Sequence, residues 1–292
     1  MAIQAQRQLQ VATVPNKRKP FPFGTLFTVL ILGFCAILMI APFLWIISAA
    51  FGKTTEVFVL PPRWFPQNPS LENFESVFNQ VPYGQFMLNS LKLAIVVTFG
   101  QLITCSMAAY AFARLDFPGK NILFLILISA LMIPGQITIV PLFILVRNLG
   151  LYNTHTALIL PGLINPFGVF LLRQYFITIP TELEDAARVD GANVFTIYWR
   201  IILPLAGPAL TTLAILTFVG MWNSYFFPLI MINSPDLQVI TVGLTLLRGQ
   251  YGAGALGPIA AALTMAIVPV LIVFIALQKY IIKSIVSSGL KT

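Results

Sequence analysis

The chain has 292 residues, of which 58% are apolar and only 9% are charged, and its mean hydropathy is +0.89. An average soluble domain is roughly 25% charged and about 45–50% apolar. These values exclude a disordered chain, a coiled coil and an ordinary soluble globular protein. They predict a protein that is largely surrounded by lipid.

Uninterrupted stretches without charge are the main indication of transmembrane helices. A helix that crosses the hydrocarbon core needs roughly 20 mostly apolar residues, and a charge at its centre costs about 2.5–3.5 kcal/mol. Six charge-free stretches are long enough: 20–52, 93–113, 121–146, 148–172, 201–235 and 249–278. The sequence therefore predicts an all-α polytopic membrane protein with six transmembrane helices, at 24–50, 86–111, 121–140, 157–176, 205–231 and 257–280.

Residues 1–23 are predicted to be a cytoplasmic N-terminal tail. The apolar run that follows, from Gly24 to Phe51, is 28 residues long. The hydrophobic region of a cleaved signal peptide has roughly 7–15 residues. We therefore expect the first helix to be a retained span and residues 24–292 to be one transmembrane domain.

The distribution of Lys and Arg predicts the orientation of the chain. With six spans both termini lie on one side, and 12 of the 17 Lys and Arg residues fall on that side. Loops rich in Lys and Arg stay in the cytoplasm, so both termini are predicted to be cytoplasmic. The net charge of +8 is then a topology signal. No basic face is long or clustered enough to predict binding of nucleic acid.

Three segments are predicted to lie outside the membrane on the other side. Residues 52–85 are rich in Pro and aromatic residues, and Ser70 there is predicted to cap a short helix. Residues 141–156 contain His155, the single histidine, and residues 232–256 are rich in Gly. These segments are expected to form the outer face.

Residues 177–204 form the most charged inner loop and carry several helix signals. Thr181 and Glu184 have the spacing of a capping box, in which each side chain satisfies a backbone N–H of the first helical turn. Gly191 is predicted to end that helix in the left-handed conformation, and Asn193 to cap a second helix. The loop is therefore predicted to be a helix–turn–helix that meets a soluble partner.

The same loop resembles the signature loop of ABC importer permeases. That family usually has Glu-Ala-Ala, three residues, Gly, nine residues and Ile-x-Leu-Pro. The matching residues here, at the same spacings, are Asp185, Ala186, Ala187, Gly191, Ile201, Leu203 and Pro204. The one departure is Asp185 in place of Glu, which keeps the carboxylate and shortens its reach by one methylene.

The resemblance covers nearly all of 24–292 and is closest to the smaller six-span permease of the maltose-type carbohydrate branch. It includes Ala109–Arg114, Leu171–Gln174 and the pair Trp222 and Asn223. It implies a type I ABC importer permease fold, multi-pass, in a bacterial inner membrane.

The resemblance also implies a set of partners. A paralogous permease would complete the pore as a heterodimer, a cytoplasmic ATPase dimer would bind ATP and Mg²⁺, and an extracytoplasmic sugar-binding protein would deliver the solute. This chain would be neither an enzyme nor a holder of cofactor or metal. The first helix of the loop would be a coupling helix in the ATPase, and the implied coupling residues are Glu182, Glu184, Asp185, Ala186, Ala187, Gly191, Leu203 and Pro204.

Polar and aromatic residues inside the predicted spans are candidates for a solute path, because amides and aromatic faces hold hydroxyl-rich ligands. These candidates are Asn89, Gln101, Asn165, Trp222, Asn223 and Tyr225. Hydrogen bonding between helices is the competing explanation. In the last outer segment, the resemblance implies contact with the binding protein at Gly249, Gln250, Tyr251 and Gly252.

Other functions stay open on the sequence alone. The solute could be a polyol phosphate or a peptide, or the chain could be an ion-coupled secondary carrier. Such carriers usually bury Asp, Glu or His in the membrane, whereas the six charge-free stretches lack Asp and Glu and His155 lies near an outer edge. ATP hydrolysis by this chain is excluded, because Gly52-Lys53-Thr54 lacks the Gly that a phosphate-binding loop requires at position 47.

Overall fold

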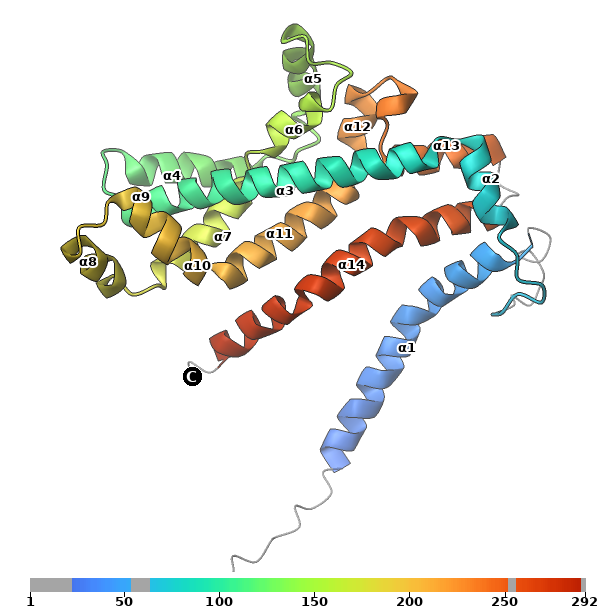
Figure 1. The fold of residues 1–292 in the computed structure, drawn as a ribbon, viewed down its shortest axis with the longest axis horizontal. Coiled ribbons are helices and arrows are strands. Elements are labelled where there is room, and N and C mark those ends of the chain that lie inside the picture. Colours follow the sequence, from blue (N-terminus) through green and yellow to red (C-terminus); the bar gives the residue numbers. More distant parts are fainter. Residues whose placement is uncertain (1–22, 54–63, 252–255, 290–292) are drawn as a thin grey trace, which may run out of the picture. The chain divides into compact units, whose positions relative to one another are not determined.

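The computed structural model describes residues 23–53, 64–251 and 256–289, and all of the secondary structure in these ranges is helical (Figure 1). The predicted tail 1–23 therefore lies, apart from Phe23, outside the described residues. The chain divides into two units, residues 1–45 and 46–292. The first contains most of α1, and the second contains the end of α1 and the other described helices.

The helices lie in the order α1 (Phe23–Phe51), α2 (Glu72–Gln80), α3 (Tyr83–Arg114), α4 (Lys120–Ser129), η1 (Ala130–Met132), α5 (Ile139–Asn148), α6 (Thr156–Gly162), α7 (Pro166–Ile177), α8 (Glu182–Val189), α9 (Val194–Ile197), η2 (Tyr198–Ile202), α10 (Leu203–Leu205), α11 (Gly207–Trp222), α12 (Phe226–Met231), η3 (Pro235–Leu237), α13 (Ile240–Tyr251) and α14 (Leu256–Gly289). The N-cap of α2 is Leu71 and not the predicted Ser70, which lies one residue earlier. The hydroxyl of Ser70 nevertheless accepts a hydrogen bond from the backbone N–H of Glu72 at 3.1 Å.

Four segments of the described chain are long and apolar enough to cross a membrane: Leu26–Phe51, Tyr83–Arg114, Thr156–Ile177 and Leu256–Gln278. A fifth candidate is the pair Val194–Leu205 and Gly207–Trp222, which is bent by 77°. The prediction of an all-helical membrane protein is confirmed. The described residues give four or five candidate spans where the sequence predicted six.

The predicted third span, 121–140, differs most from the structure. Its helix ends at Met132, since α4 contributes 10 residues and η1 three more. At 1.5 Å per residue this is about 20 Å, against roughly 30 Å of hydrocarbon. The helix ends because Pro134 has no N–H to donate and forces Ile133, the residue before it, into an extended conformation.

The predicted fourth span, 157–176, is interrupted between α6 and α7. Asn165 precedes Pro166 and is extended, with φ −135° and ψ 102°, as a residue before proline prefers. Its side-chain oxygen accepts a hydrogen bond from the N–H of Gly168 at 3.2 Å and so caps α7.

The predicted fifth span, 205–231, is also interrupted. α11 ends at Trp222, and α12 begins four residues later at Phe226. Pro228 cannot donate to the carbonyl of Ser224 as a helical residue would. That carbonyl instead accepts a hydrogen bond from the hydroxyl of Thr241 on α13 at 2.5 Å.

The helix α3 packs against both α7 and α11, and α11 packs against α14 (Figure 1). Gly168 on α7 permits the close approach, because a Cβ at that position would lie 3.0 Å from the sulfur of Cys105 on α3 and 3.0 Å from a methyl carbon of Leu213 on α11. Small residues at helix contacts are the usual means of close packing in membranes.

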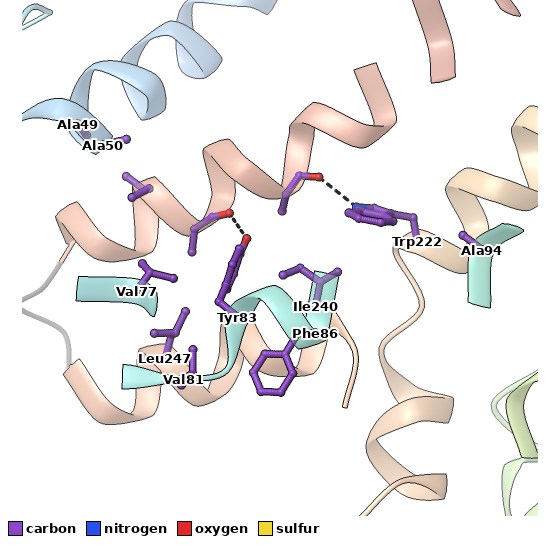
Figure 2. Packing of buried hydrophobic residues seen from close by; sticks show 14 of the residues in the cluster. Ala49, Ala50, Val77, Val81, Tyr83, Phe86, Ala94, Trp222, Ile240 and Leu247 are labelled. Atoms are coloured by element: carbon purple, nitrogen blue, oxygen red, sulfur yellow. Dashed lines mark hydrogen bonds between the residues drawn. The ribbon is translucent and has the colours of Figure 1, made fainter. Parts of the chain in front are cut away.

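The buried cluster that contains Tyr83 and Trp222 ties α3 and α11 to α14 through two side-chain hydrogen bonds (Figure 2). The hydroxyl of Tyr83 donates to the carbonyl of Ala262, and the indole N–H of Trp222 donates to the carbonyl of Ala266 at 3.1 Å. Both aromatic side chains are almost fully buried. Their polar atoms therefore find partners, as buried polar atoms must.

Gly243 on α13 packs against the ring of Phe86, and a Cβ there would lie 2.3 Å from a ring carbon. We expect Gly243→Ala to destabilise the protein by about 1–3 kcal/mol, which is typical of overpacking. The apparent melting temperature of the detergent-solubilised chain measures this effect. Gly220→Ala on α11 is the matched control, because a Cβ there meets nothing within 4 Å. The control is expected to melt at or above the wild-type temperature, and equal losses in both variants would contradict the prediction.

Candidate functional site

The helix α8 contains the residues that the sequence marks as functional. Figure 1 shows it at one end of α3, next to α9 and α10. Of its eight residues only Glu184 and Ala187 are buried. The rest of the helix surface is therefore free to meet another protein.

The predicted capping box at the start of α8 is not formed. Thr181 makes no side-chain cap, and the N–H of Glu184 donates to the carbonyl of Thr181 at 2.9 Å. The carboxylate of Glu184 points into the protein instead of back along its own helix. The prediction was wrong because the spacing Thr-x-x-Glu does not reveal a stronger partner that is distant in the sequence.

The predicted end of α8 is confirmed at Gly191. This residue is left-handed, with φ +82°. Its N–H donates to the carbonyl of Arg188 at 3.0 Å, and the N–H of Ala192 donates to the carbonyl of Ala187 at 2.9 Å. This pair of hydrogen bonds is a Schellman motif, which satisfies the last carbonyls of the helix.

The predicted second helix is also present. Asn193 caps α9, since its side-chain oxygen accepts the N–H of Thr196 at 2.8 Å. The π-helix η2 follows, and the hydroxyl of Tyr198 lies 2.8 Å from the hydroxyl of Ser106 on α3. Leu203 and Pro204 form the start of α10, directly before the 77° bend, and are thus not on the exposed face of α8.

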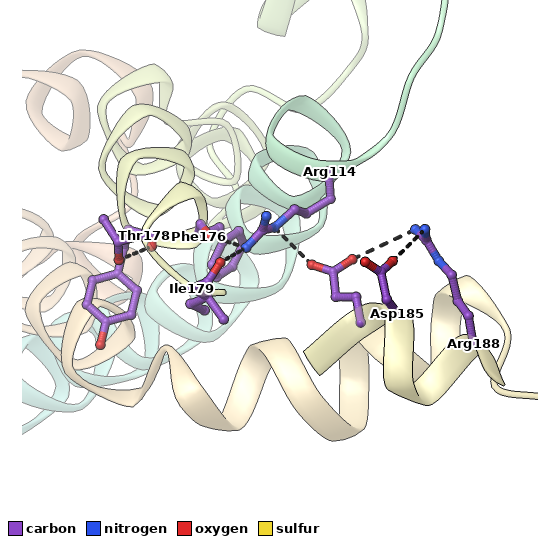
Figure 3. Close-up of polar contacts among 8 residues, drawn as sticks. Arg114, Phe176, Thr178, Ile179, Asp185 and Arg188 are labelled. Carbon is purple, nitrogen blue, oxygen red and sulfur yellow. Dashed lines mark hydrogen bonds and ion pairs between the residues drawn. The ribbon is translucent and has the colours of Figure 1, made fainter. Parts of the chain in front are cut away.

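The partner of Glu184 is Arg114, the last residue of α3 (Figure 3). The Nε of Arg114 lies 2.9 Å from Oε1 of Glu184, and both side chains are less than 10% exposed. One Nη of the same guanidinium donates to the carbonyls of Phe176, at 2.8 Å, and Ile179. The sequence analysis used Arg114 for orientation and for the family pattern and missed this role. A cation at the last position of an apolar span was the available signal.

The burial of this ion pair sets its energetic importance. Removal of one member of a buried pair leaves the other charge unpaired, which typically costs about 3–5 kcal/mol. The ion pair of Arg188 and Asp185, at 3.5 Å, is more than half exposed on both sides. Exposed pairs of that kind contribute about 0–1 kcal/mol. Glu184 is therefore a fixed part of the structure, and Asp185 is free to exchange partners.

The exposed face of α8 combines an apolar stripe with carboxylates. Leu183, Ala186 and Val189 are spaced three residues apart, and the side chain of Val189 is 88% exposed. Such spacing places side chains on one face of a helix. Glu182 and Asp185 lie exposed beside the stripe. This surface suits a partner that has an apolar cleft with a basic rim.

Three of the residues predicted for a solute path are engaged inside the protein. The Nδ2 of Asn89 donates to the carbonyls of Asp236 and Gln238. Gln101 donates to the carbonyl of Gly162 and accepts hydrogen bonds from Asn165 and Thr217. Trp222 is the donor to α14 described above, and all three are at least 90% buried. These three side chains therefore form hydrogen bonds between segments of the chain, as the competing explanation expects.

Asn223 and Tyr225 differ from those three. Both lie in the break between α11 and α12, Asn223 is exposed, and Tyr225 is half-buried. Among the described residues neither side chain has a hydrogen-bond partner. They are the predicted path residues whose polar groups remain available.

The residues predicted to contact a binding protein are described only in part. Gly249 lies in α13, and a Cβ there would meet nothing within 4 Å. Gln250 and Tyr251 are the last residues of that helix. Gly252 lies outside the described residues.

Comparison with known proteins gives a consistent result along most of the chain. Residues 101–287 match the family described as the binding-protein-dependent transport system inner membrane component. An arabinooligosaccharides transport system permease protein of Halalkalibacterium halodurans is 37% identical over 278 residues, which cover 94% of this chain and 99% of that protein. A sulfoquinovosyl glycerol transport system permease protein of Agrobacterium fabrum is 33% identical and covers 86% and 88%.

Two further comparisons concern solute class and fold. An sn-glycerol-3-phosphate transport system permease protein of Yersinia pestis is 29% identical over 269 residues, or 87% of this chain and 96% of that protein. A crystal structure of a bacterial ABC transporter involved in the import of the acidic polysaccharide alginate contains a similar chain. The TM-score is 0.77 at 26% identity, over 88% of this chain and 96% of that chain.

The left-handed conformation of Gly191 gives a test of the loop geometry. We expect Gly191→Ala to lower the apparent melting temperature, because a Cβ costs roughly 1–2 kcal/mol in this conformation. Gly191→Asn is the control, since Asn tolerates the left-handed region better than Ala. Nothing lies within 4 Å of either new Cβ, so a clash does not complicate the comparison. Equal stability of the two variants would contradict the strained-backbone explanation.

Proposed function

This chain belongs to the family of binding-protein-dependent transport system inner membrane components, and from that membership we infer that it is the pore-forming permease subunit of a sugar importer. The single observation that carries this conclusion is the match over almost the full length of a permease named for arabinooligosaccharide transport. Relatives named for sulfoquinovosyl glycerol and diacetylchitobiose support the same solute class. Proteins of this kind are transport components and not enzymes.

We propose that the chain crosses the bacterial inner membrane six times in a type I ABC importer permease fold, with both termini in the cytoplasm. The one span that is missing from the five candidates is the predicted third span. It would be supplied by α4 and η1, which are apolar but short, so that the bilayer would be locally thinner around them. The excess of Lys and Arg on the predicted inner side supports the orientation. α8 then lies on the cytoplasmic side.

The exposed face of α8 is proposed to be the coupling surface for an ATPase dimer. ATP and Mg²⁺ would bind to that dimer and not to this chain. The stripe of Leu183, Ala186 and Val189 would enter an apolar cleft, and Glu182 and Asp185 would meet basic residues at its rim. Closure of the ATPases would move α8 and rock the spans between inward-open and outward-open states, as coupling between distant sites requires.

A paralogous permease is proposed to complete the pore, and an extracytoplasmic binding protein to deliver the sugar to the opposite face. Gly249, Gln250, Tyr251 and Gly252, at the end of α13 and just beyond it, are the proposed contact with that binding protein. Within this chain, Asn223 and Tyr225 are the proposed solute contacts, because their side-chain polar groups have no partner among the described residues.

A phosphorylated polyol is the second candidate solute, because the relative from Yersinia pestis is named for sn-glycerol-3-phosphate transport. The two candidates are separated by the ligand that copurifies with the binding protein. An ion-coupled mechanism is excluded by the family to which the chain belongs.

The docking surface can be tested with Ala186→Arg in the complete transporter. The substitution places a long charged side chain in the proposed apolar cleft, and because Ala186 is exposed we expect the fold to stay intact. We expect the amount of ATPase that copurifies to fall at least tenfold. Asp116→Arg is the control on the neighbouring turn between α3 and α4, where the side chain is fully exposed. Retention of the ATPase by Ala186→Arg would contradict the proposed surface.

The solute contacts can be tested with Asn223→Ala in proteoliposomes that contain the transporter and its loaded binding protein. We expect a lower maximal uptake rate and an unchanged melting temperature, because the side chain of Asn223 makes no hydrogen bond within the described chain. Asn89→Ala is the counterpart, since it removes three hydrogen bonds and should lower the melting temperature. Wild-type uptake by Asn223→Ala would remove this residue from the path.

A further inference from the structure

We propose that the buried ion pair of Arg114 and Glu184 makes α8 move as one body with α3 and α7, so that both residues are positioning residues for coupling. The inference rests on the proposed function, in which an ATPase moves α8. It goes beyond that function because it assigns the route by which the movement enters the membrane helices. The route is lateral, into α3, in addition to the path along the chain into α11.

The contacts of Arg114 support this assignment. Its guanidinium touches three elements at once: α3, to which it belongs, the carbonyls of Phe176 and Ile179 at the end of α7, and the carboxylate of Glu184 on α8. Figure 3 shows these contacts converging on one side chain. A movement of α8 therefore acts on the ends of two membrane helices through a single rigid, planar group.

The rest of α8 is weakly attached to the protein. Ala187 is its only other buried residue, and it contributes one methyl group to the buried cluster. The backbone links on either side are short and without helix, at 178–181 and 190–193. A methyl group can slide against its neighbours at little cost, whereas separating a buried ion pair leaves both charges unpaired inside the protein. The ion pair is therefore the contact that resists displacement of α8.

Glu184 and Asp185 are adjacent, yet they face different surroundings. Glu184 is 3% exposed and is held by Arg114, so it cannot reach an external partner. Asp185 is exposed and pairs with Arg188 at 3.5 Å. Arg188 also lies 3.9 Å from the second oxygen of Glu184. One carboxylate thus serves the inside of the permease and the next serves the ATPase. Asp116→Asn, at an exposed carboxylate in the turn between α3 and α4, is therefore the control for Glu184→Gln.

The test follows the distance between α8 and α3 in the complete transporter. Spin labels are placed at Thr181→Cys, directly before α8, and Met107→Cys on α3, after Cys35 and Cys105 have been replaced by alanine; both labelled positions are exposed. The distance is measured without nucleotide and with Mg-ATP and vanadate. We expect no change in the otherwise wild-type chain and in Asp116→Asn. In Glu184→Gln we expect a nucleotide-dependent shift larger than the width of the nucleotide-free distribution.

Several outcomes would overturn the inference. One is a nucleotide-dependent shift in the otherwise wild-type chain, and another is a constant distance in Glu184→Gln. If Glu184→Gln does not retain the ATPase, Arg114→Lys replaces it, because Lys keeps the charge but cannot bridge α7 and α8 with one planar group. A constant distance in that variant, or loss of the ATPase from both variants, also counts against the inference. Failure of the unlabelled wild type to hold an ATPase would instead contradict the proposed function.

Discussion

The structure depends on one constraint, which is that backbone polar groups inside a membrane must find partners within the protein. Continuous helices meet it automatically, and this chain interrupts its helices repeatedly. At the break between α6 and α7, the carbonyls of Gly162 and Leu163 accept hydrogen bonds from Gln101 and Thr104 of α3. At the break after α11, Thr241 serves the carbonyl of Ser224. These two interruptions are thus compensated by side chains from other helices.

The same constraint explains why polar residues were misleading as markers of a solute path. Gln101 and Asn89 are buried because they satisfy backbone carbonyls of other segments, and little of their hydrogen-bonding capacity is left for a ligand. At the end that carries α8 the pattern is repeated with a charge. Arg114 satisfies carbonyls at the end of α7 and is itself neutralised by Glu184. The polar residues that satisfy backbone groups and the polar residues that remain available for a ligand are therefore different residues. Only their hydrogen-bond partners distinguish them.

The sequence predicted what depends on local chemistry and missed what depends on distant partners. The absence of charge located α1, α3 and α14, and the conformational preferences of Gly191 and Asn193 placed the ends of α8 and α9. Proline broke the predicted third and fifth spans, because hydropathy does not count backbone N–H groups. The inward orientation of Glu184 could not be predicted, since Arg114 lies 70 positions earlier in the chain.

The π-helix η2 has a consequence for the register of everything that follows it. A π-helical turn holds one residue more than an α-helical turn, and each residue of an α-helix rotates the chain by about 100°. Deletion of one residue between Tyr198 and Ile202 would restore a regular helix and leave the composition nearly intact. The wider π turn absorbs the extra residue locally, so the segments on either side of it keep their direction. The π-helix therefore allows this segment to be one residue longer without displacing α11.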